Sequence, residues 1–98
     1  MDEEYERNVG RVMEYLATKA RSKRVVQDHR ECFSRLASHL DANRLTYSED
    51  VARKWLSDIA DDLCKTTHSI YAGALSKLDD AYAGGAIRSF HYLSLIHI

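Results

Sequence analysis

The chain has 98 residues, a formal net charge of −1 and a hydrophobic fraction of 45%. This length suits one domain with a modest core, and the hydrophobic content excludes a disordered chain. The 30% of charged residues and the lack of an apolar run near roughly 20 residues exclude a transmembrane span. The acidic start, Met1–Glu4, has no hydrophobic run behind it, so we expect no secretory signal and a cytoplasmic location.

The first predicted element is an amphipathic helix over residues 2–20. Its apolar residues recur at helical spacing, and they are Tyr5, Val9, Val12, Met13 and Leu16. Gly10 lies inside this helix, where glycine costs about 1 kcal/mol relative to alanine. We therefore expect Gly10 to mark a close approach of two backbones.

A basic turn over residues 21–24 leads into the second predicted helix. The face of this helix that we expect to be buried carries Val26, His29, Phe33, Leu36, Ala37 and Leu40. Residues 41–43 are expected to end it, with Asn43 in the left-handed conformation.

Ser48 predicts the start of a third helix, because a capping hydroxyl is followed by two acids in the first turn. The stripe of this helix is Val51, Trp55, Leu56, Ile59 and Leu63. Trp55 is expected in the core. Asp61 and Asp62 oppose the helix dipole, which indicates that the helix ends early or that a cation lies nearby.

Residues 65–85, KTTHSIYAGALSKLDDAYAGG, predict the helix around which the fold is organised. One stripe collects its apolar residues, which are Ile70, Tyr71, Ala74, Leu75, Leu78 and Tyr82. Gly84 and Gly85 are expected to end the helix. The predicted fold class is therefore all-α, four helices with short connections.

The start of the fourth helix is a candidate phosphate site. Its first backbone N–H groups have no partner inside the helix, and the nearby side chains add a cation and hydroxyl groups. These side chains are Lys65, Thr66, Thr67 and His68. We also expect the hydroxyls to cap the helix.

The second and fourth helices resemble each other in sequence. Phe33–Leu36 matches Leu75–Leu78 in residue type, and the same alignment places Lys23 on Lys65. The second helix also follows a basic, hydroxyl-bearing turn, Ser22, Lys23 and Arg24. Cations at helix starts oppose the dipole and favour a bound anion, so we expect the two turns to bind phosphates together. The alternative is that the basic cluster only marks the end of the first helix, where the helix dipole by itself favours cations.

Residues 5–88 resemble the N-terminal core-binding, SAM-like domain of tyrosine recombinases, the phage-integrase family. The resemblance rests on a capped helix with a tyrosine, an Ala-Leu pair, a second aromatic residue and a glycine. In this chain they are Thr66, Tyr71, Ala74-Leu75, Tyr82 and Gly84. It implies an all-α fold, a four-helix orthogonal bundle made of two helical hairpins. It also implies that this small domain clamps DNA together with a separate catalytic domain and has a role in DNA integration and recombination. The implied partners are double-stranded DNA, contacted at the two basic turns, the catalytic domain and other recombinase protomers.

The chain departs from that family in lacking the catalytic domain. Arg88–Tyr92 contains catalytic residue types, but a short tail cannot hold a nucleophile in place. We therefore expect a non-catalytic fragment without a cofactor, with a domain over residues 1–88 and a tail over 89–98. Leu93–Ile98 resembles a translated sequencing adapter, so the native sequence is expected to stop near Tyr92. The alternative is a genuine terminal segment docked on the core.

Cysteine and histidine occur as pairs at two places in the chain. His29 with Cys32, and Cys64 with His68, have spacings that zinc ligands use, but the absence of a Cys-x-x-Cys motif favours reduced core thiols and no metal. Lys77 is expected to be exposed on the fourth helix, where it either extends the DNA contact or is simply solvated.

The sequence thus predicts a DNA-binding module without enzymatic activity. The rival hypothesis is a small helical module that binds another protein. The two differ in whether Lys23, Arg24, Lys65 and Thr66 share one surface, because DNA requires a continuous basic strip.

Overall fold

The computed structural model describes residues 2–19 and 22–87, which fold into four α-helices and one short 3-10 helix. These are α1 (Glu3–Lys19), α2 (Lys23–Asn43), α3 (Glu49–Ile59), η1 (Ala60–Asp62) and α4 (Lys65–Tyr82). No strand occurs in this part of the chain, so the all-α prediction is confirmed. The predicted tail, with Tyr92 and Leu93–Ile98, lies outside the described residues.

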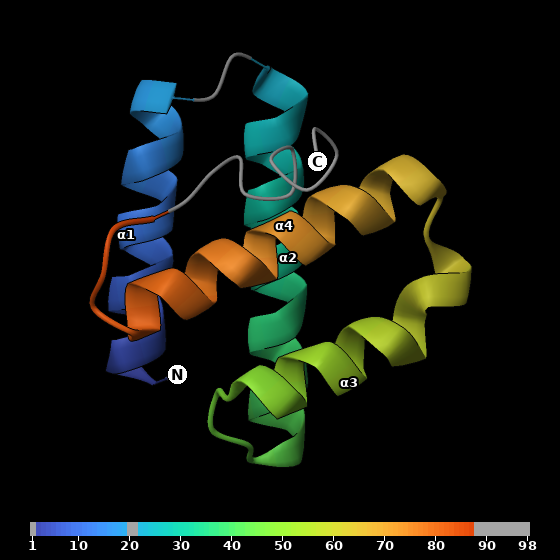
Figure 1. Ribbon diagram of the computed structural model, residues 1–98. Helices are drawn as coiled ribbons and strands as arrows, with labels where there is room; N and C mark the ends of the chain where they lie inside the picture. The colour runs from blue at the N-terminus through green and yellow to red at the C-terminus, as the bar shows by residue number, and fades with distance from the viewer. Residues whose placement is uncertain (1, 20–21, 88–98) are drawn as a thin grey trace, which may run out of the picture.

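The four helices form two hairpins laid crosswise (Figure 1). α1 and α2 lie side by side and antiparallel, while α3 and α4, joined through η1, run across them. α4 contacts α1, α2 and α3. This is the orthogonal arrangement that the resemblance implied, and it places α4 at the centre of the packing.

The core lies between the two hairpins, and α2 and α4 supply most of its buried hydrophobic residues. Tyr71, Ala74, Leu75 and Leu78 have no exposed surface, and burying a leucine side chain contributes about 2 kcal/mol. The predicted stripe of α4 is thus confirmed at these positions, with Ile70 half-buried at its edge. Trp55 is buried as expected and stacks on Tyr71, with ring centroids 6.3 Å apart.

The end of α2 differs from the prediction by one residue. Arg44, not Asn43, adopts the left-handed conformation, with φ of 53°. The Leu45 N–H then donates to the Leu40 carbonyl at 2.8 Å, which satisfies a free carbonyl of the last turn. Asn43 stays helical, and its side-chain amide donates to the His39 carbonyl at 2.9 Å.

The starts of α3 and α4 are capped in different ways. Ser48 caps α3 as predicted, because its hydroxyl accepts from the Val51 N–H at 3.1 Å. The hydroxyl cap predicted for α4 is wrong, since α4 begins directly after Cys64 and Thr66 and Thr67 lie inside its first turn. The Cys64 side chain makes no capping hydrogen bond. The first N–H groups of α4 are therefore less well satisfied than those of α3.

The ends of α3 and α4 follow the sequence signals. α3 ends at Ile59 and passes into η1, so the early end indicated by Asp61 and Asp62 is confirmed. Gly84 has φ of 77° after α4, as expected for a terminating glycine.

The two cysteines differ in their surroundings. Cys32 is buried as predicted, whereas Cys64 is exposed because it lies at the corner between η1 and α4. The prediction that both thiols belong to the core is therefore wrong for Cys64.

The close approach expected at Gly10 is not made within the described chain, because a Cβ there would meet nothing within 4 Å. None of the described helices combines the length and the hydropathy needed to cross a membrane.

Candidate nucleic-acid interface

The structure separates the predicted site residues into two helix starts and one buried side chain. Ser22, Lys23 and Arg24 are exposed at the start of α2. At the start of α4, Lys65 and Thr66 are exposed, while Thr67 and His68 are half-buried. Lys77 is 6% exposed.

The start of α2 combines a hydroxyl cap with two cations. The Ser22 hydroxyl accepts from the Val25 N–H at 3.4 Å, so this serine is the predicted N-cap. No acid lies in the first turn. Arg24 pairs with Asp28 across one turn, with 3.6 Å between Nε and Oδ2, and its side chain remains 67% exposed. The positive charges of this turn therefore face solvent next to free N–H groups.

The start of α4 is organised around the exposed Cys64. Its thiol donates to the Thr67 hydroxyl at 3.2 Å. The Thr67 hydroxyl, then the backbone N–H groups of Thr67 and Thr66, lower the pKa of the Cys64 thiol because they stabilise its anion. The same donors are suited to an anion presented from outside.

The two helix starts lie close enough to interact electrostatically. The positive charge of Arg24, on α2, also lowers the pKa of the Cys64 thiol, at the start of α4. The charge of Arg24 is therefore felt at the first turn of α4, although Arg24 and Cys64 are 40 positions apart in the chain. In Figure 1, α2 starts at the top of the molecule and α4 starts at its right edge.

Lys77 does not belong to that surface, and the prediction that it is exposed is wrong. Its ammonium donates to Nε2 of His29 at 3.1 Å, while Nδ1 of His29 donates to the Val25 carbonyl at 2.8 Å. Burial, followed by the nearby Lys77, lowers the pKa of His29 to about 4, and burial lowers the pKa of Lys77. The physical reason is the packing of α4 on α2, which turns the Lys77 face of α4 inward. A β-carbon at Gly73 would lie 3.6 Å from the ammonium.

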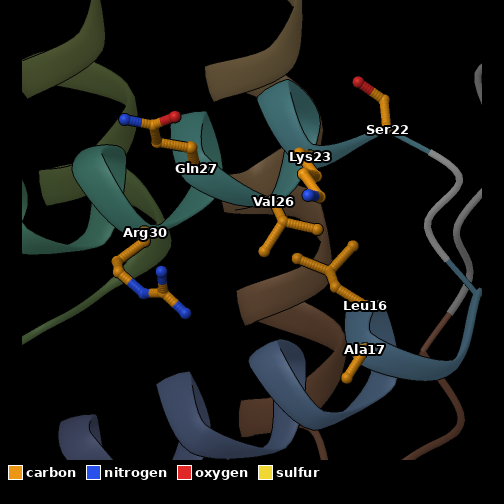
Figure 2. A pocket seen from close by; sticks show the side chains of 7 residues that line it. All are labelled: Leu16, Ala17, Ser22, Lys23, Val26, Gln27 and Arg30. Atoms are coloured by element: carbon orange, nitrogen blue, oxygen red, sulfur yellow. The ribbon is translucent and has the colours of Figure 1, made fainter.

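Lys23 faces a groove on the seam between α1 and α2 (Figure 2). The groove has a volume of about 540 Å³, and its lining includes Ser22, Lys23 and Arg30. The sequence analysis missed Arg30. The available signal was spacing, because Lys23 and Arg30 are seven residues apart and lie two turns apart on one face of α2.

The two histidine–cysteine pairs show no metal geometry. Within residues 2–19 and 22–87, no group of three or more His, Cys, Asp or Glu side chains is arranged to hold a metal ion. Both ring nitrogens of His29 already have partners.

No protein-family model matches the chain, no curated protein matches it, and no solved structure matches it. The class that the geometry itself defines is an all-α domain of two crossed hairpins, with exposed cations at the starts of α2 and α4.

Proposed function

We propose that this chain binds the phosphate backbone of double-stranded DNA through the first turns of α2 and α4. The observation that supports the proposal is that the starts of α2 and α4 both carry exposed cations, with the charge of Arg24 near enough to lower the pKa of the Cys64 thiol. The role of core-binding module in a tyrosine-type recombinase is part of the proposal and rests on the sequence resemblance. The catalytic domain and other protomers as partners rest on the same resemblance. The lack of enzymatic activity and a cytoplasmic location are also part of the proposal, and the latter rests on the acidic start of the chain, which no hydrophobic run follows.

The chemistry of each turn suits a phosphate. A helix start offers free N–H donors and a positive dipole end. At α4, Lys65 and Thr66 add an exposed cation and an exposed hydroxyl. At α2, Lys23 and Arg24 are exposed and no acid lies in the first turn. A phosphate placed at either start relieves the unfavourable combination of side-chain cation and helix dipole.

The expected binding is weak and dependent on salt. A protein that neutralises Z phosphates releases counterions, so log K falls linearly with log salt with a slope near about −0.9Z. The three or so cations of these two turns can neutralise few phosphates compared with most DNA-binding proteins. We therefore expect detectable binding at low salt and little binding at physiological salt.

The test is a fluorescence-anisotropy titration of the full chain with a labelled duplex of arbitrary sequence at several salt concentrations. The variant Lys23→Ala/Arg24→Ala/Lys65→Ala removes three cations from the two turns. We expect it to bind more weakly, with a salt slope that is shallower by about one unit for each phosphate that is no longer neutralised.

A matched control removes three cations from other parts of the surface. Arg7→Ala/Arg44→Asn/Lys54→Ala makes the same change in net charge, and asparagine tolerates the left-handed conformation of residue 44. This control should keep most of the affinity and the original slope. Absence of binding at low salt, or an equal decrease in both variants, would refute the DNA interface and favour the protein-binding alternative.

A further inference from the structure

The seam between α1 and α2 carries an open groove, of which the proposed DNA contacts use only the end at Ser22 and Lys23. A second hollow of about 430 Å³ continues the groove of Figure 2 and shares Arg30 with it. Val9, Gly10 and Phe33 form part of its lining. The seam therefore presents apolar surface and a glycine backbone to the outside.

Nothing within the described chain explains why position 10 is a glycine. A glycine inside a helix costs stability relative to alanine, and it is usually retained where a turn or a close backbone approach requires it. Gly10 is helical and exposed, and a Cβ at this position would meet nothing within 4 Å. A backbone that approaches Gly10 closely must therefore belong to something other than residues 2–19 and 22–87 of the same copy.

Two opposite charges flank Gly10 on the same hollow. Glu6 and Arg30 both line it and are exposed, and neither side chain has a hydrogen bond or an ion pair within the described part of the chain. The helical rise places Glu6 about 6 Å before Gly10 along α1. Arg30 also lines the groove of Figure 2, toward Leu16, whereas Glu6 lines only the second hollow. Arg30 therefore lies toward the other end of α1 from Glu6, and Gly10 lies between them.

We propose that the chain forms a two-fold symmetric homodimer in which the α1–α2 seam of one copy packs on the same seam of a second copy, with Gly10 at the axis. A two-fold interface is self-complementary, so a residue that contacts another is contacted by it in return. The rotation brings Glu6 of each copy opposite Arg30 of the other and produces two equivalent ion pairs. The absence of a side chain at Gly10 lets the two α1 helices approach closely. This inference is independent of the proposed DNA binding.

The first test is sedimentation velocity of the full chain at increasing protein concentration. We expect the mass to rise from 11.2 kDa toward twice that value. A chain that stays monomeric at all concentrations refutes the dimer.

Charge reversal identifies the surface that is used. Glu6→Arg and Arg30→Glu each place like charges opposite one another, so each variant alone should dimerise at least about tenfold more weakly. An equimolar mixture of the two variants should dimerise again, because every arginine then faces a glutamate. This recovery is expected only if the two residues pair between copies.

Asp61→Arg is the control, because it makes the same change in charge at an exposed position of η1, which lines neither hollow of the seam. It should leave the association unchanged. A dimer that tolerates both seam reversals, or is weakened equally by Asp61→Arg, refutes the seam interface.

Gly10→Ala separates helix stability from association. Alanine should raise the thermal midpoint of the monomer and weaken the dimer, because its methyl group would lie between the two helices. If the dimer is unaffected by this substitution, Gly10 is not at the axis.

Discussion

The His29–Lys77 pair is the most unusual contact between single side chains in this protein. Both groups are buried, at 2% and 6% exposure, and they lie 3.1 Å apart. Two adjacent cations would repel in a medium of low dielectric, so His29 must be neutral. A neutral ring that donates through Nδ1 accepts through Nε2, and this tautomer suits the Lys77 ammonium.

The His29–Lys77 pair predicts that the stability of the protein depends on pH. Burial and then Lys77 lower the pKa of His29 from 6.5 to about 4, while the hydrogen bond to the Val25 carbonyl and then Asp28 oppose this shift. The unfolded chain therefore binds a proton more readily than the folded chain between pH 6.5 and 4, and stability falls as the pH drops through this window. The decrease should reach about 3 kcal/mol. Burial also lowers the pKa of Lys77, against the effect of Asp80, so this group likewise favours higher pH.

The measurement is denaturant unfolding across this pH range, beside His29→Gln. Glutamine can still accept a hydrogen bond from Lys77, but it does not titrate. The variant should therefore lose less stability than the parent as the pH falls. Parallel curves for the two proteins would show that His29 does not change protonation on unfolding.

At the scale of the helices, the cap residues of α3 and α4 offer a direct comparison. Ser48 bonds the Val51 N–H at 3.1 Å, whereas the Cys64 side chain caps nothing. Ser48→Ala should lower the free energy of unfolding by about 1 kcal/mol, and Cys64→Ser should raise it by up to about that amount.

Chemical denaturation, analysed with the same dependence on denaturant concentration for all proteins, gives the change in the free energy of unfolding for each variant. Cys64→Ala serves as the control, because removal of a thiol that does not cap should have little effect. If Cys64→Ser and Cys64→Ala behave alike, the extended backbone at this position, with φ of −72° and ψ of 163°, does not present the hydroxyl to the first turn.

At the scale of the whole molecule, stability depends on the packing of α4 against α1, α2 and α3. Leu75 is fully buried there, while Leu45, in the connection between α2 and α3, is 41% exposed. Leu75→Ala should cost about 2–5 kcal/mol, because it removes buried apolar surface and leaves a cavity. The identical change at Leu45 should cost less than about 1 kcal/mol.

Urea unfolding of both variants tests this expectation. Similar decreases in stability at the two positions would mean that the packing around α4 collapses into the space that Leu75 leaves, or that the core is loosely packed.

The sequence by itself determined the helices and their buried faces. Helical spacing of apolar residues located the stripes of α1 to α4, and Ser48 and Gly84 marked ends because their effects are local. Four stripes and short connections also predicted an all-α fold, while the crossing of the two hairpins was expected from the resemblance. Both candidate basic turns were found in this way, since a helix start and its neighbouring cations are adjacent in the chain.

Only the tertiary structure decided which polar residues leave the surface and which segments meet. Periodicity placed Lys77 next to the apolar stripe of α4 but did not show that α2 would bury it against His29. It likewise gave no sign that Cys64 would be exposed, or that Arg24 would lie within electrostatic range of it. These outcomes depend on how α4 crosses α2, and that crossing is set by side-chain packing between residues far apart in the sequence.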